Sequence, residues 1–253
     1  AIQQRDRKWH VSKNGLTMIV VSAGTFVMGS SDSDVMAYLN ERPTHQVTIS
    51  SFSFAQHEVT QELYQKIMGD NPSFDKGDAT QPVTDVLWLD AIRFCNKLSV
   101  KENLEPYYTE DGEIVSIFGN GYRLPTESEW EYACRAGTTT PWSFGGDESH
   151  LGDYAWNRSN SGYKPHPVGE KKPNPWGLHD MQGNVWEWCW DWYGKYKPGS
   201  SKDPLGPENG IERLLRGGSF PDPSLVVRSA ARNNYRPSLQ SIHFGFRPSR
   251  TYP

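Results

Sequence analysis

Cysteine is scarce in this sequence. Its 253 residues contain three, Cys95, Cys134 and Cys189, which lie far apart with no C-x-x-C spacing. This spacing excludes a zinc ribbon and a thioredoxin-type redox motif, and the odd number argues against a complete disulfide framework. We interpret all three as small buried side chains.

Strong charge of one sign and long apolar runs are lacking too. The net charge of −4 argues against a nucleic-acid partner or an anionic membrane surface. No apolar run approaches the length of a membrane span. The first residues, Ala1 to Gln4, show neither an initiator Met nor the apolar core of a signal peptide. We therefore expect any membrane attachment to come only from a lipid anchor outside this chain.

Repeats and low-complexity linkers are absent, which predicts a polar N-terminal extension over residues 1–16 and a single domain over 17–253. What the chain does have is aromatic and turn-forming residues, namely 10 Trp, 23 Gly and 18 Pro. This composition favours a loop-rich fold with large rings filling the interior.

Short elements are expected along the whole chain. A capping box of Thr126 with Glu129 and a stop at Gly137 predict one helix, and Thr60 is placed to cap another. Residues 138–184 show little periodicity. The elements expected up to that point are strands at 18–21, 24–29 and 45–54, the last with a slip at residues 50–51, and helices at 61–68, 87–98 and 126–137.

The segment 185–193 is the most informative strand. Its four tryptophans, at 186, 188, 190 and 192, share one parity, while Glu187 and Asp191 share the other. We interpret the indoles as core. A carboxylate in such surroundings needs an arginine, a backbone amide or a metal ion as its partner, and all three stay open. Further strands are expected at 214–216, entering a glycine turn, at 228–232 and at 244–247.

Several phrases occur in an order that resembles the formylglycine-generating enzyme, or sulfatase-modifying factor, family. They are Gly24–Ser30, His45–Val47, His57–Thr60, Pro82–Thr84, Tyr122–Glu131, Gly183–Trp188, Arg216–Phe220 and Gly245–Arg247. The resemblance covers nearly the whole chain. It implies an α+β fold of the C-type-lectin-like kind, coil-rich, with short helices and small antiparallel sheets.

One departure from the family pattern bears on activity. Formylglycine-forming members carry two copper-binding cysteines between the Gly-Gly-Ser turn and the following arginine-rich strand, whereas residues 220–228 here contain none. Copper(I) needs thiolates, so we expect no formylglycine synthesis. A sulfoxide-forming branch holds non-haem iron with histidines of an added helical domain, which this chain lacks. We therefore predict a protein that is not an enzyme and requires no cofactor.

The C-terminal part resembles the variable proteins of diversity-generating retroelements, treponemal ones among them. In that resemblance residues 217–247 form a variable region, with Arg228, Ser229, Ala230 and Arg232 as fixed framework. The positions expected to bind a ligand are Pro221, Asp222, Pro223, Leu225, Val226, Ala231, Asn233, Asn234, Tyr235, Arg236, Leu239, Ser241, Ile242 and His243.

The resemblance also implies a structural calcium site and a place of action. The calcium ligands would be the side chains of Asp180 and Glu187 with the carbonyls of Gly183 and Val185, oxygen donors that suit Ca²⁺. A display protein of this kind is expected at the cell surface or outside the cell, bound to a protein or another cell-surface ligand. The alternative is a member of fixed specificity that acts as an oxidoreductase or an accessory domain.

Overall fold

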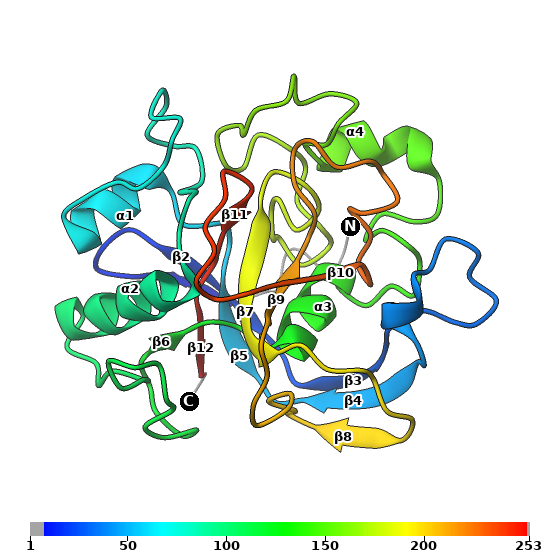
Figure 1. Ribbon diagram of the computed structural model, residues 1–253, viewed down its shortest axis with the longest axis horizontal. Coiled ribbons are helices and arrows are strands. Elements are labelled where there is room, and N and C mark those ends of the chain that lie inside the picture. Colours follow the sequence, from blue (N-terminus) through cyan, green and yellow to red (C-terminus); the bar gives the residue numbers. More distant parts are fainter. Residues whose placement is uncertain (1–7, 252–253) are drawn as a thin grey trace.

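The computed structural model describes residues 8–251 and shows the expected α+β fold, with short helices packed around small sheets (Figure 1). The longest helix in the described range has 14 residues. No helix between residues 8 and 251 combines the length and the apolar character needed to span a bilayer. Irregular segments make up much of the rest, as the glycine and proline content predicts.

The largest sheet joins the two ends of the described chain. Its strand order is β1-β2-β5-β12-β6 and all its pairs are antiparallel. β1 falls within the expected extension 1–16, so part of that extension pairs with the domain, while residues 1–7 lie outside the described range. The strands are β1 (Trp9–Val11), β2 (Thr17–Val21), β5 (Phe52–Ala55), β6 (Tyr122–Arg123) and β12 (Ser249–Thr251).

Two smaller sheets complete the described strands. The sheet β10-β9-β7-β11 carries the predicted variable region, and the third has the order β3-β4-β8. Each contains one parallel pair, β7 with β11 and β4 with β8, beside its antiparallel pairs. The strands are β7 (Trp186–Trp192), β9 (Arg213–Arg216), β10 (Arg232–Tyr235), β11 (Phe244–Gly245), β3 (Gly24–Met28), β4 (His45–Ile49) and β8 (Ser200–Lys202).

The helices begin where capping residues place them. The Thr60 hydroxyl accepts a hydrogen bond from the Leu63 amide at 3.2 Å, and the Thr126–Glu129 capping box is formed. Between residues 138 and 184 only η2 and α4 are helical, which confirms the irregular character of that segment. The helical segments are η1 (Leu39–Glu41), α1 (Gln61–Met68), α2 (Trp88–Lys101), α3 (Glu127–Arg135), η2 (Glu148–His150) and α4 (Leu151–Tyr154).

Aromatic rings pack throughout the interior, as predicted, together with aliphatic side chains. All three cysteines are free and buried. Trp186 and Trp188 lie in the core, but the pairing of β7 with β9 shifts register between Trp188 and Trp192. Trp190 therefore stacks on Tyr108, with ring centroids 5.0 Å apart, and Trp192 faces the guanidinium of Arg213 at 3.6 Å. Trp186 and Trp188 are thus buried and Trp190 packs against the same core, as predicted, while Trp190 and Trp192 are only half-buried.

Three predicted strands are shorter than expected. The slip at Ser50-Ser51 divides the 45–54 segment into β4 and β5, because Asp203 accepts hydrogen bonds from the Ser50 amide and hydroxyl at 2.7 Å each. The 228–232 strand begins only at Arg232, since the Ala231 amide donates to the Arg228 carbonyl in a turn at 3.1 Å. The closing strand ends at Gly245.

Buried ion pairs join these elements. The Glu131 carboxylate, fully buried on α3, accepts from Arg135 at 2.8 Å, from the Gly29 amide at 2.9 Å and from Arg216 of β9. Burial opposes the ionised form of Glu131, but the charges of Arg135 and Arg216 lower its pKa below the ordinary value. The pair is therefore charged at neutral pH, and it links β3, α3 and β9.

We expect Glu131→Gln to destabilise the fold by about 3–5 kcal/mol, because Arg135 and Arg216 would lose the carboxylate they share and Arg216 would keep only that of Glu127, 3.6 Å away. Urea unfolding measures this loss. The matched control is Asp153→Asn, which breaks an exposed pair with Lys172 (2.8 Å, side chains 52% and 62% exposed) and should leave the free energy of unfolding almost unchanged. Equal losses of unfolding free energy in the two variants would show that the buried pairs of Glu131 stabilise the fold no more than an exposed pair does.

Candidate ligand-binding site

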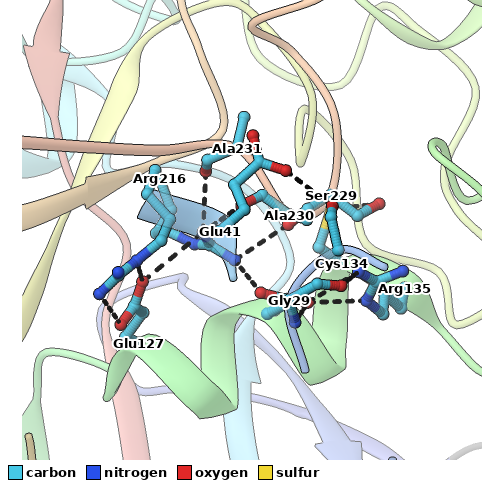
Figure 2. A network of polar contacts seen from close by, with 12 residues as sticks. Gly29, Glu41, Glu127, Cys134, Arg135, Arg216, Ser229, Ala230 and Ala231 are labelled. Carbon is cyan, nitrogen blue, oxygen red and sulfur yellow. Dashed lines mark hydrogen bonds and ion pairs between the residues drawn. The ribbon is translucent and has the colours of Figure 1, made fainter. Parts of the chain in front are cut away.

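Three buried arginines hold the base of the predicted variable region. Arg216 donates to the carbonyls of Ser229 (3.0 Å), Ala230 (3.0 Å) and Ala231 (2.8 Å), as Figure 2 shows. Its guanidinium is fully buried, so these bonds fix the backbone of the 229–231 turn against β9. A backbone held by charged donors does not depend on the side chains of the neighbouring loops.

The other two arginines fix the ends of this turn. Arg228 forms a two-pronged pair with the Glu41 carboxylate at 2.9 and 2.6 Å. Arg232 does the same with Glu127 at 2.6 and 2.9 Å. We call Arg216, Arg228 and Arg232 the arginine frame. The loops on either side of the frame, 219–227 and 233–243, carry nearly all the predicted binding positions.

These loops enclose a pocket of about 350 Å³. Seven of the fourteen predicted positions line it, which brings together residues up to 22 positions apart in the sequence. The lining residues are Trp186, Ser219, Pro221, Asp222, Asn233, Tyr235, Leu239, Gln240, Ser241, His243 and Phe244.

Aromatic rings form part of the pocket. The Tyr235 ring rests on buried Phe244, with centroids 4.9 Å apart, yet Tyr235 remains 41% exposed. On the loop that follows, Leu239 is 46% and Ile242 is 41% exposed. The pocket thus offers apolar surface on a supported backbone, an arrangement suited to recognition.

Polar side chains complete the lining, Asp222 and His243 among them. Asp222 Oδ2 accepts from the Ser219 amide at 2.9 Å and from its hydroxyl at 2.8 Å, which closes a tight turn. The His243 ring lies 5.0 Å from that of Phe220. Burial lowers the pKa of His243 below its ordinary value, although Asp222 and Asp85 act in the opposite direction. His243 is therefore neutral at pH 7 and can both donate and accept hydrogen bonds.

The other seven predicted positions do not line the pocket. Arg236 and Ile242 are exposed, and Pro223, Leu225, Val226 and Asn234 are half-buried. Val226 packs against the main core, and the Leu225 carbonyl accepts from Arg228 at 2.7 Å. Ala231 is only 1% exposed, so its side chain does not reach the surface where a binding position was expected. The Arg216 clamp on its carbonyl draws this residue inward.

The cysteines lie away from this pocket. Cys95 is on α2, Cys134 on α3 and Cys189 on β7, and none of them lines it. Burial raises the pKa of all three thiols, that of Cys134 to about 12. Because the thiolate is the form that binds metals and attacks substrates, these thiols are unreactive at neutral pH.

Of the partners left open for Glu187, the structure shows the arginine. Arg247 Nε and Nη2 donate to its two oxygens at 2.7 and 2.6 Å, and Trp130 Nε1 donates at 2.7 Å. A calcium ion would have to compete with this guanidinium, so Glu187 does not fit the predicted oxygen shell as it stands. Within residues 8–251 no group of three or more His, Cys, Asp or Glu side chains is placed to hold a metal. Calcium at Asp180, Gly183, Val185 and Glu187 stays a prediction.

Beside that pair lies a carboxyl group that the sequence analysis missed. Glu58 is buried, and its Oε1, like Asp180 Oδ1, has no hydrogen-bond partner in the described structure. Burial raises the pKa of Glu58 well above its ordinary value, and that of Asp180 to about 6. The only signal in the sequence was the phrase His57–Thr60, whose resemblance does not state where Glu58 points.

Asp191, the second carboxylate of the β7 segment, has a backbone amide as its partner. Its Oδ2 accepts from the Glu127 amide, the first of α3, at 2.7 Å. Burial raises the pKa of Asp191 to about 8, and the nearby Glu127 charge adds to the shift, whereas the amide opposes it. Between its ordinary value of 3.8 and about 8, the folded chain therefore binds a proton that the unfolded chain releases.

This shift predicts that Asp191 makes stability fall as pH rises from about 4 to about 8. In Asp191→Asn, which keeps an acceptor for the Glu127 amide, that part of the slope should disappear. As the pH rises from 5 to 8, the free energy of unfolding of the variant should rise by about 1–3 kcal/mol relative to that of the wild type, because one pKa unit corresponds to about 1.4 kcal/mol. Urea unfolding at both pH values measures this, and parallel pH curves would contradict it.

Comparison with known proteins confirms the resemblance. The Treponema denticola variable protein 1 has a similar structure, with a TM-score of 0.88 and 35% identity over 98% of this chain and 99% of that one. The formylglycine-generating enzyme of Thermomonospora curvata is 28% identical, covering 91% of this chain and 92% of the relative. The chaperone protein LppX of Paenibacillus barcinonensis is 38% identical over 69% of this chain and 71% of the relative.

A family model, the sulfatase-modifying factor enzyme 1-like domain, matches residues 5–252. Both the order of the phrases and the α+β fold agree with this match. The chain therefore belongs to the family of sulfatase-modifying factor enzyme 1-like domains.

Proposed function

We propose that this chain is a non-enzymatic display protein that binds a protein ligand, at the cell surface or outside the cell, through the pocket of residues 219–244. One observation carries the proposal. Seven predicted binding positions from two separate loops line a single pocket, while the arginine frame fixes the backbone between them. Side chains in the loops can then change with little effect on the fold.

The chemistry of the rim favours a protein as the ligand. Tyr235 and Arg236 are adjacent and exposed, and these two residue types supply much of the binding energy in protein interfaces. Exposed Leu239 and Ile242 add apolar area. The mixture of a rigid aromatic ring, a guanidinium and aliphatic groups is typical of surfaces that recognise folded proteins.

A finer part of the proposal is that retroelement mutagenesis diversifies this surface. The similarity to the Treponema denticola variable protein 1 supports it, as does the separation of frame from loops. The alternative is an oxidoreductase of fixed specificity. Metal analysis of the purified protein separates the two, because stoichiometric copper or iron would overturn the non-enzymatic proposal.

The location of the surface can be tested with peptides selected on the intact protein from a phage-displayed random dodecapeptide library. Replacing Tyr235 and Arg236 together with Ala should weaken these peptides by about 100-fold or more, since two interface anchors are lost. The melting temperature should stay within about 2 °C, because both side chains are exposed. A large loss of stability would mean that the residues are structural.

Diversification is tested by sequencing the 3′ end of the gene in sister isolates. We expect the substitutions to be confined to the loops 219–227 and 233–243. Arg216, Arg228 and Arg232 should be invariant, because losing one of them would take a positive charge away from a buried carboxylate. Ala231 should also be constant. A uniform sequence across isolates would leave a binding protein of fixed specificity.

A further inference from the structure

A loop outside the variable region lies directly against it. Residues 71–85 connect α1 to α2, and in Figure 1 this segment runs beside the loop that precedes β11. The Asp85 amide donates to the Ser241 carbonyl at 3.0 Å. Ser241 lines the pocket, so Asp85 links the constant part of the chain to the edge of the proposed binding surface.

Asp85 uses its side chain to hold a second residue. Its Oδ2 accepts from the Phe74 amide at 3.0 Å, so one residue bridges Phe74 and Ser241. Asp85 has a φ of 58°, in the left-handed region that few residues other than Gly, Asn and Asp adopt readily. This strained conformation turns its amide and its carboxylate toward the two partners.

Further bonds fix the rest of the loop. The Ser73 hydroxyl accepts from the Thr84 amide at 3.0 Å, and the Ser73 amide donates to Asn71 Oδ1 at 3.1 Å. Asn71 Nδ2 in turn donates to Gln61 Oε1, on the first turn of α1, at 2.9 Å. The backbone on both sides of Phe74 is therefore held in place before any ligand arrives.

The side chain that this scaffold presents is apolar and faces solvent. Phe74 is 86% exposed, and it makes no ring contact in the described part of the chain. Burying such a ring in an interface is favourable, whereas leaving it in water stabilises nothing in the fold. A rigidly held and exposed phenyl ring beside a binding pocket suits contact with a partner.

The charged residues around Phe74 indicate which kind of partner this surface can bind. The loop carries Asp75, Asp78 and Asp85 against a single Lys76, and Asp222 lines the neighbouring pocket. This acidic surrounding disfavours phosphate-rich partners such as nucleic acid or anionic lipid. It fits a protein surface with an apolar patch bordered by basic residues.

We propose that Phe74 is a constant contact residue of the binding surface and that Asp85 positions it against the variable loop. The inference rests on the proposed binding function and extends the surface beyond residues 217–247. Every variant of this protein would then share one apolar contact, while the loops 219–227 and 233–243 discriminate among partners that present a matching apolar patch.

The test uses the dodecapeptides selected on wild-type protein. Phe74→Ser should lower the affinity of the protein for most of these peptides about tenfold or more. The control is Phe118→Ser, a phenylalanine 87% exposed in the loop between α2 and β6, which should change nothing. Peptides weakened by Tyr235→Ala and unaffected by Phe74→Ser would overturn this inference alone. Peptides sensitive to Phe118→Ser and unaffected by Tyr235→Ala would overturn the proposed function as well.

The positioning role of Asp85 has its own readout. In Asp85→Ala the Phe74 amide loses its acceptor, so its hydrogen exchange should accelerate and peptide affinity should fall as in Phe74→Ser. Asp85→Asn keeps an acceptor oxygen and tolerates the left-handed backbone, so it should restore slow exchange and binding together. Unchanged peptide binding in Asp85→Ala would show that Asp85 does not act through Phe74.

Discussion

The pairing of buried arginines with buried carboxylates is the constraint on which this structure depends. Each charge has left water and would be costly alone, so both partners must be present for the fold to form. Arg228 reaches Glu41 across 187 residues, and Arg232 reaches Glu127 across 105. These pairs join distant segments of the chain, and they lie between short helices and small sheets that the hydrophobic core also holds together.

Local features of the fold could be predicted from the sequence. The capping residues Thr60 and Thr126 place the starts of α1 and α3, and the tryptophan pattern identifies β7. The partners of Glu187 and Asp191 could not be assigned, because they come from a C-terminal arginine and from the first amide of α3. The turn at 228–231 was also missed, since alternation of Arg and Ala predicts a strand when the carboxylates that receive the arginines are unknown.

The candidate site, too, could be predicted only in part from the sequence. Resemblance placed the binding positions in residues 217–247, and half of them meet at one pocket, but only the three-dimensional arrangement shows that Ala231 turns inward. Phe74 carries no sequence signal at all. It is one phenylalanine among ten, distinguished only by its exposure and by the hydrogen bonds around it.

The position of β12 determines which part of the chain completes the largest sheet. This strand, Ser249–Thr251, lies between β5 and β6 and closes the largest sheet, yet it is translated after the whole variable region. A chain that ended before Ser249 would lack this strand and would leave β5 and β6 without their shared neighbour. Unpaired strand edges of this kind expose a chain to proteolysis and aggregation. The largest sheet therefore needs segments from both ends of the described chain, and its closure depends on residues that follow the predicted variable region.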